Sequence, residues 1–285
     1  MSDKGKVVLG IDVGFAPRKE TTGFCALCWD ESRIRIRFAA TTSDPQERRR
    51  ALSALISTDE LVAVGIDGPL THALRVVNHY RAAEALLSRG VLQKRGKPGQ
   101  TSAPVGQRLH EHATALAKMT LELSCVRAST HRDPIHERCV VEAFPSMFMA
   151  ALVDEARLPR LRRDASDRYW ELLVHGSDRL IELFAHLLPE RRLEADLTEI
   201  RNHEHRAALV CALTGLSVAR GDYVAVGDPE DGDSVLPPRG MWGSGANGSG
   251  PWLEVGLKDN LDRVRGARAS HPNHARARIV IGPTG

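Results

Sequence analysis

The sequence predicts an α/β fold in which a mixed central sheet is flanked by helices. Three observations support this prediction. The chain opens with three strand-like segments in succession, a helix then leads to a fourth strand that is apolar on both faces, and helical segments dominate the second half. A strand that is apolar on both faces is typical of a buried, parallel position. The predicted order of the opening is therefore βββαβ.

The first three strands are predicted from their hydrophobic patterns. Residues 6–13 and 21–29 are two short, mainly apolar runs. In residues 33–41, isoleucine and phenylalanine alternate with arginine, which is the period of a half-exposed antiparallel strand. The opening therefore predicts a three-stranded meander.

The next elements alternate between helix and strand. A helix over residues 45–57 leads to the buried strand 61–67. Helical periodicity returns over residues 80–88 and again over residues 107–125, with a Gly- and Pro-rich connection between them.

The second half begins with an apolar strand over residues 137–144, which runs into a proline suited to the first turn of a helix. Helical segments then follow over residues 146–155, 166–188 and 199–219. Gly176 lies inside the second of them and weakens its pattern. A short strand over residues 223–226 and an acidic turn complete the predicted elements.

A Gly- and Ser-rich stretch divides the C-terminal part from the rest. Its composition predicts a flexible linker over residues 243–251. We therefore expect one α/β domain over residues 1–242 and a basic C-terminal tail over residues 252–285, which is too short to bury a core of its own. As an alternative, its apolar end at residues 279–281 adds an edge strand.

Composition excludes several classes of protein. With 285 residues, 42% of them hydrophobic, the chain can bury a sizeable core. The first apolar segment is too short for a signal peptide or a membrane span, so a cytoplasmic location without a membrane partner is expected. The five cysteines are an odd number without an export signal, which disfavours structural disulfides. Cys25 and Cys28 lie on a predicted strand, where a spacing of three places them on opposite faces.

Three of the predicted strands carry a single carboxylate at or near their ends, namely Asp12, Asp67 and Glu142. Two carboxylates about 4 Å apart repel by roughly 4 kcal/mol at an effective dielectric near 20. If the strand ends converge, the acids need raised pKa values or a bound cation. Ribonuclease H-like domains bring acids together in this strand order around two divalent metals, and oxygen ligands favour Mg²⁺ or Mn²⁺. The alternative is that each acid caps a turn or a helix.

Several short motifs, in order along the chain, resemble a known family. They are Gly10-Ile11-Asp12-Val13-Gly14, Thr22-Gly23-Phe24, Gly65-Ile66-Asp67-Gly68-Pro69-Leu70, Arg81-Ala82-Ala83-Glu84, Val141-Glu142-Ala143-Phe144-Pro145-Ser146 and Ala208-Leu209-Val210-Cys211-Ala212-Leu213-Thr214. The ordered set resembles the domain-of-unknown-function family 429, whose members are described as predicted nucleases. The resemblance implies a ribonuclease H-like fold with a helical insertion, in which Asp12, Asp67 and Glu142 are the metal ligands.

The sequence departs from this family pattern at Ala207, because relatives commonly have Asp immediately before the last of these motifs. Candidate replacements lie near the start of the same predicted helix. Glu204 is a candidate fourth catalytic acid and metal ligand, and His205 is a further candidate ligand. The alternative for Glu204 is an acid that stabilises the helix through its dipole.

Two other acidic motifs have a structural interpretation. Glu84 either helps to position a metal or water, or pairs with Arg81 one helical turn away. In the sequence His110-Glu111-His112, the two histidines do not share a helical face, so surface positions are expected.

The basic stretch between residues 89 and 108 contains no acid and is a candidate contact for nucleic acid. The residues assigned to this contact are Lys94, Arg95, Lys97 and Arg108. With the acids, they predict a Mg²⁺- or Mn²⁺-dependent nuclease that acts on DNA or RNA through a two-metal mechanism. Its predicted catalytic residues are Asp12, Asp67, Glu142 and Glu204.

Two other functions are left open by the sequence. The alanine at position 207 favours a catalytically inactive binding or scaffolding protein with the same fold. The opening Asp12-Val13-Gly14 also fits an ATP-binding protein similar to actin or the sugar kinases. Such proteins usually need two domains of comparable size, and the predicted domain leaves room for only one.

Overall fold

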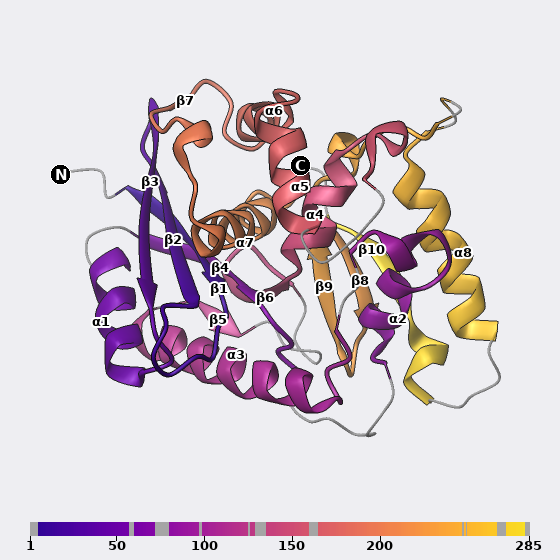
Figure 1. Cartoon of the computed structure of the whole chain (residues 1–285), viewed down its shortest axis with the longest axis horizontal. Coiled ribbons are helices and arrows are strands. Elements are labelled where there is room, and N and C mark those ends of the chain that lie inside the picture. Colours follow the sequence, from indigo (N-terminus) through magenta and orange to yellow (C-terminus); the bar gives the residue numbers. More distant parts are fainter. Residues whose placement is uncertain are drawn as a thin grey trace.

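The computed structural model describes residues 5–56, 60–71, 80–96, 99–124, 126–128, 135–159, 165–246, 248, 250–266 and 272–282. These residues form one ten-stranded mixed sheet with helices on both faces (Figure 1). The strand order is β10-β8-β9-β6-β4-β1-β2-β3-β7, and β5 pairs with β6. The predicted α/β class with a mixed central sheet is therefore confirmed.

The opening has the predicted βββαβ order. Strands β1 (Lys6–Asp12), β2 (Thr22–Trp29) and β3 (Arg33–Thr41) form an antiparallel meander. Helix α1 (Pro45–Ile56) then leads to β4 (Glu60–Asp67), which pairs with β1 in parallel. The six central residues of β4 are all buried, which explains its unbroken apolar run.

The other elements complete the sheet and cover its faces. The larger helices are α2 (Ala82–Ser88), α3 (Pro104–Leu123), α4 (Pro145–Leu152), α5 (Ala165–Val174), α6 (Arg179–Leu187), α7 (His203–Ala219) and α8 (Trp252–Gly266). The strands are β5 (Arg127–Ala128), β6 (Cys139–Ala143), β7 (Arg192–Leu193), β8 (Val224–Asp228), β9 (Gly232–Leu236) and β10 (Arg278–Ile281). Across the described ranges, no helix has the length and apolar character that crossing a membrane requires.

Several elements differ from the predicted ones. The helix predicted over residues 166–188 is two helices, because the chain turns at Gly176, whose amide bonds to the carbonyl of Glu171. The acidic turn predicted at residues 228–233 is observed, but strand β9, which follows it, was not predicted. Strand β9 forms a hairpin with β8, and the turn uses Gly232 at φ +91°.

Helix α7 packs unusually close to the central strands. A Cβ atom on Gly10 would lie 2.0 Å from the carbonyl oxygen of Ala208, and one on Gly65 would lie 2.1 Å from that of Cys211. Only glycine therefore fits at these positions on β1 and β4. Gly23 on β2 has the same role against Glu204, where the corresponding distance is 2.2 Å. The three glycines place the first turn of α7 beside the carboxyl end of β1.

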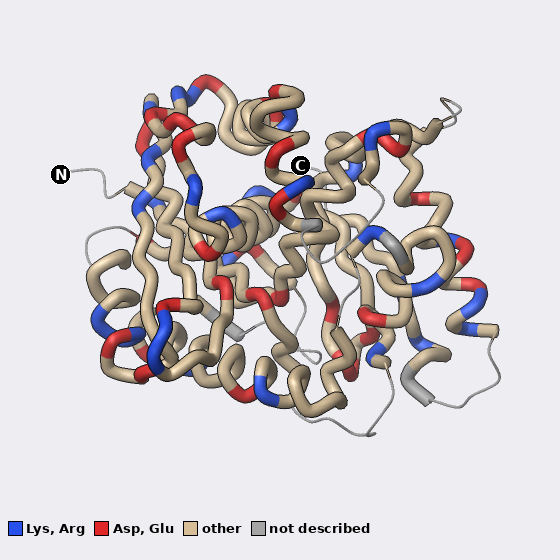
Figure 2. The backbone as a smooth tube through the Cα atoms, in the orientation of Figure 1, with Lys and Arg blue, Asp and Glu red and all other residues tan. Residues whose placement is uncertain are grey.

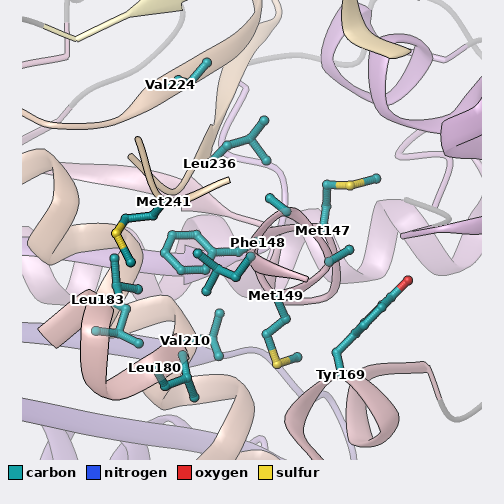
Figure 3. Close-up of a cluster of buried hydrophobic side chains, with 14 of the residues drawn as sticks. Met147, Phe148, Met149, Tyr169, Leu180, Leu183, Val210, Val224, Leu236 and Met241 are labelled. Carbon is teal, nitrogen blue, oxygen red and sulfur yellow. The ribbon is translucent and has the colours of Figure 1, made fainter. Parts of the chain in front are cut away.

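The largest core lies between the sheet and helices α4 to α8. Figure 3 shows part of this core, in which Met147, Phe148 and Met149 of α4 are surrounded by apolar side chains from α6, α7 and the β8–β9 hairpin. A second core lies on the other face of the sheet, beneath α1 and α3. The central strands are thus covered by packed layers on both faces of the sheet.

The four cysteines within the described residues are all buried. Cys25 belongs to the first core and Cys28 to the second, so the two side chains lie on opposite faces of β2, as predicted. This geometry prevents them from sharing a disulfide or a metal.

The C-terminal residues differ from the predicted separate tail. Trp252, Leu253 and Leu257 of α8 are buried in the first core, and the indole of Trp252 donates to the carbonyl of Val153 at 2.9 Å. Strand β10 pairs with β8 at one edge of the sheet, so the alternative of an added edge strand is the one observed. Ser244 and Pro251, near the two ends of the predicted linker, form an antiparallel bridge, and α8 lies against α2 (Figure 1).

We expect Asn260→Ala to lower the free energy of unfolding by about 1 to 3 kcal/mol, because a buried side-chain hydrogen-bonding group is lost. Asn260 is fully buried on α8, and its amide donates to the carbonyls of Leu86 and Arg89 at 2.7 and 2.9 Å. Urea denaturation measures the change. Asp259→Ala is the matched control on the exposed face of α8 and should change stability by less than about 0.5 kcal/mol. Equal effects would contradict the anchoring role of Asn260.

Candidate active site

Asp12 and Asp67 lie side by side at the carboxyl ends of two parallel strands. They are directly paired in the register of β1 and β4, and their carboxyl groups lie close enough for each to shift the pKa of the other. Each residue keeps part of its surface open to solvent, although protein atoms crowd the carboxyl groups closely. The predicted convergence of these two acids is therefore observed.

The surroundings favour a proton or a cation between the two carboxyl groups. Burial and the charges of Asp67 and Glu204 hold the pKa of Asp12 well above its usual range. Burial is also the main cause that raises the pKa of Asp67 to about 7, with a further contribution from the charge of Glu142. Two full negative charges at this position are therefore unfavourable near neutral pH without a cation.

Glu204 reaches this region from the start of α7. Asn202 caps the helix, since its side chain accepts a hydrogen bond from the amide of His205. Glu204 then lies in the first turn, near enough to Asp12 to raise its pKa. The first helical turn and the Asp12–Asp67 pair thus form one acidic region.

Among the described residues, His205 makes no hydrogen bond or ion pair with the candidate acids, although the charge of Glu204 acts on its ring. Its ring stacks on Phe38, with centroids 4.7 Å apart and planes 8° from parallel. Burial lowers the pKa of His205, so the ring is neutral near neutral pH. Ala207 is buried in the same helix and leaves the position of the expected fourth acid apolar.

Glu142 lies near Asp67 but is occupied by protein groups. Its Oε1 accepts hydrogen bonds from Arg81 Nη2 at 2.7 Å and Ser234 Oγ at 2.8 Å. Its Oε2 accepts from Arg81 Nη1 at 3.0 Å and the amide of Leu70 at 3.2 Å. All four acceptor positions of the carboxylate are therefore filled.

Arg81 is the centre of a buried ionic network. Besides Glu142, its Nε donates to Glu84 at 2.9 Å and Thr101 at 3.1 Å, and its Nη1 donates to the carbonyl of Asp231 at 3.1 Å. Burial lowers the pKa of Arg81, but the charges of Glu142 and Glu84 raise it more strongly. Of the two interpretations of Glu84, the structure shows the pairing with Arg81.

A cavity of about 210 Å³ opens beside this network. Its polar lining includes Asp67, Arg81, Glu84, Thr101, Glu142 and Ser234. Leu87, Leu109 and Phe144 supply apolar walls. The volume corresponds to about seven water molecules at roughly 30 Å³ each and is below the usual range for drug-sized ligands. The cavity therefore suits one small group.

The donor set fits a cation at Asp12 and Asp67 better than it fits the predicted two-metal centre. Two adjacent carboxylates with raised pKa values supply the oxygen ligands that Mg²⁺ and Mn²⁺ prefer. Glu142, in contrast, has no acceptor position left. Among the residues that the structure describes, no three His, Cys, Asp or Glu side chains are arranged as a metal cluster.

The four predicted nucleic-acid contacts do not form one described surface. Arg95 donates to the carbonyl of Pro159 at 3.3 Å and is half-buried, whereas Arg108 is exposed on α3. Lys94 ends the short helix η1 (Gly90–Lys94), but its side chain lies outside the description, and Lys97 lies outside the described residues.

The histidines predicted to lie at the surface are half-buried instead. His110 Nδ1 lies 3.0 Å from the carbonyl oxygen of Pro69, and His112 Nδ1 lies 3.1 Å from Arg48 Nη1. Sequence reasoning also missed Ser234 as a partner of Glu142. Its strand, β9, was not predicted, so nothing in the sequence placed Ser234 near the acids.

Comparison with known proteins identifies one family. Residues 10–231 match the sequence model of a family described as "Protein of unknown function (DUF429)". No curated protein and no solved structure shows a significant match to the chain. The matched range contains Asp12, Asp67, Arg81, Glu142 and Glu204, whereas α8 and β10 lie beyond it.

Proposed function

The chain belongs to the DUF429 family, and from its paired strand-end acids we propose that it is a Mg²⁺- or Mn²⁺-dependent nuclease. The observation that carries this proposal is the Asp12–Asp67 pair, whose raised pKa values favour a cation at that position. The order β3-β2-β1-β4-β6 and the βββαβ opening support a ribonuclease H-like fold as part of the same proposal.

The residues have distinct roles in this proposal. Asp12 and Asp67 hold the ion through their carboxylate oxygens, and Glu204 adds negative charge on the side of α7. A bound divalent ion at this position supplies Lewis-acid stabilisation of a phosphoryl oxygen and lowers the pKa of bound water. Glu142 is a positioning residue, because Arg81 and Ser234 fix it beside Asp67.

Metal binding and cleavage by the same protein samples test the proposal. We expect calorimetric titration to show Mn²⁺ binding that Asp67→Asn removes, and cleavage of labelled DNA or RNA that requires Mn²⁺ and Asp67. Asp30→Asn is the matched control, since Asp30 is an aspartate just after β2 and remote from the site. Cleavage of equal rate by wild type and Asp67→Asn would refute the proposal.

A catalytically inactive binding protein is the second candidate. Two observations favour it: the filled acceptor positions of Glu142 and the apolar side chain at position 207. The titration distinguishes the two functions, because a protein without a working metal site at the acid pair would bind no Mn²⁺ and cleave no substrate.

A further inference from the structure

A partly exposed aromatic side chain lies three residues after Asp12. Phe15 follows β1 in the loop that connects it to β2, and its ring contacts two side chains of α3. The guanidinium carbon of Arg108 lies 4.7 Å from the ring centroid, and the ring of His112 stacks at 6.0 Å with planes 14° apart. Residues four apart share a helix face, so both partners support Phe15 from α3.

A buried arginine fixes this cluster in place. Arg48 of α1 is 3% exposed and donates to the carbonyl of Gly14 at 2.6 Å and to Thr22 Oγ1 at 2.9 Å. The same guanidinium contacts His112 at 3.1 Å. Arg48 therefore ties the loop that carries Phe15 to both β2 and α3, and the aromatic cluster is preorganised.

One exposed cation contacts the ring, and two more lie in the same loop. Arg18 and Lys19 are exposed in the same loop, and Arg108 is exposed on α3. Within the described ranges, no carboxylate lies in ion-pair distance of any of these three side chains. Glu20 in the loop and Glu111 on α3 are also exposed, so acids are interspersed with Lys and Arg here as they are along the rest of the chain (Figure 2). The cations beside Phe15 are thus available for phosphate groups.

A second stack lies on the opposite face of the sheet. Phe38 and His205 are both half-buried, and Phe38 packs against the core beneath α7. Phe15 instead lies against α3, which covers the other core. Since His205 follows Glu204, the two aromatic stacks flank the acidic end of the sheet from its two sides.

We propose that Phe15, Arg108 and His112 form a stacking platform that binds single-stranded nucleic acid and leads it to Asp12 and Asp67. Aromatic side chains stack on the exposed faces of unpaired bases, and such faces are hidden in a duplex. Arg18, Lys19 and Arg108 contact the phosphates. The identity of the substrate rests on the proposed nuclease function, whereas binding by the platform does not.

Fluorescence anisotropy with a labelled single strand of about 12 nucleotides tests the platform. A duplex and an RNA strand of the same sequence are compared, all in EDTA to prevent cleavage. We expect the wild type to bind the single strands at least about 10-fold more tightly than the duplex. Phe15→Ala should weaken single-strand binding by about 5- to 150-fold, the range measured for loss of one stacking contact, and Phe15→Trp should restore it.

The affinity of Arg108→Gln for the single strand, measured at about 50 and about 200 mM salt, tests whether Arg108 contacts a phosphate. Loss of one phosphate contact should make the slope of log binding constant against log salt concentration shallower by about 0.7. Ile181→Ala on α6 and Arg263→Gln on α8 are exposed controls outside the cluster and should bind as the wild type does. Thermal melting confirms that each variant is folded.

The outcomes separate this inference from the proposed function. Equal affinity for single strand and duplex, or unchanged binding by folded Phe15→Ala, would overturn the platform even if Mn²⁺-dependent cleavage is found. Binding that depends on Phe15, in a protein that never cleaves, supports the platform and refutes the nuclease.

Discussion

Replacing Arg81 by methionine is expected to lower the free energy of unfolding by about 3 to 5 kcal/mol, the usual effect of removing one partner of a buried ion pair. Arg81 is 7% exposed and neutralises both Glu84 and Glu142. Methionine is similar in length, so the loss would come from the two carboxylates left buried without a cation. Urea denaturation at pH 7 measures the change.

An exposed ion pair serves as the control, because it shows whether the loss of stability comes from burial of the charges or from the loss of any ion pair. Arg239 also makes two hydrogen bonds to one carboxylate oxygen, that of Glu254, but its side chain is 49% exposed. Arg239→Met should therefore cost less than about 1 kcal/mol. Adding Glu142→Gln to Arg81→Met should recover part of the loss, because one buried charge is removed. If Arg81→Met proves no worse than Arg239→Met, the network does not stabilise the fold.

The elements that sequence analysis placed well are those with local signals. Strand β4 was identified because all its central side chains are apolar, and β3 because isoleucine alternates with arginine. The glycines of β1 and β4 also reflect a contact with α7 that the sequence alone does not reveal. Gly10 and Gly65 precede the two acids because α7 crosses the strands there, a contact between distant segments that no local pattern specifies.

In the candidate site, too, local signals could be predicted and contacts between distant segments could not. Acids at strand ends follow from the hydrophobic pattern, and the parallel pairing of β1 and β4 then aligns Asp12 with Asp67. The environment of Glu142 could not be inferred in this way. It depends on Arg81, Leu70 and Ser234, which come from three separate parts of the chain. The C-terminal segment was misjudged because its Gly/Ser connection resembles a linker, although Trp252 anchors helix α8 in the core.

The acid pair itself predicts an unusual dependence of stability on pH. The pKa of Asp67 is about 7 in the folded protein and 3.8 in an unperturbed side chain. Between these values the native state binds more protons than the unfolded state, so the free energy of unfolding falls as pH rises from about 4 to about 7. At about 1.4 kcal/mol per pH unit, reduced because the pair is partly open to solvent, this amounts to about 2 to 4 kcal/mol.

Asp67→Asn is therefore expected to be more stable than the wild type at pH 8 in EDTA, by about 2 to 4 kcal/mol, and to match it near pH 4. Mn²⁺ at about 100 times its Kd should stabilise the wild type by about 2.7 kcal/mol and leave Asp67→Asn unchanged. Asp30→Asn should lose stability at pH 8, because hydrogen bonds from the amides of Ser32 and Arg33 lower the pKa of Asp30. An Asp67→Asn protein that is less stable than the wild type at pH 8 would contradict this prediction. It would show that ionisation of the Asp12–Asp67 pair does not destabilise the folded protein, so that a cation would have no repulsion to offset there.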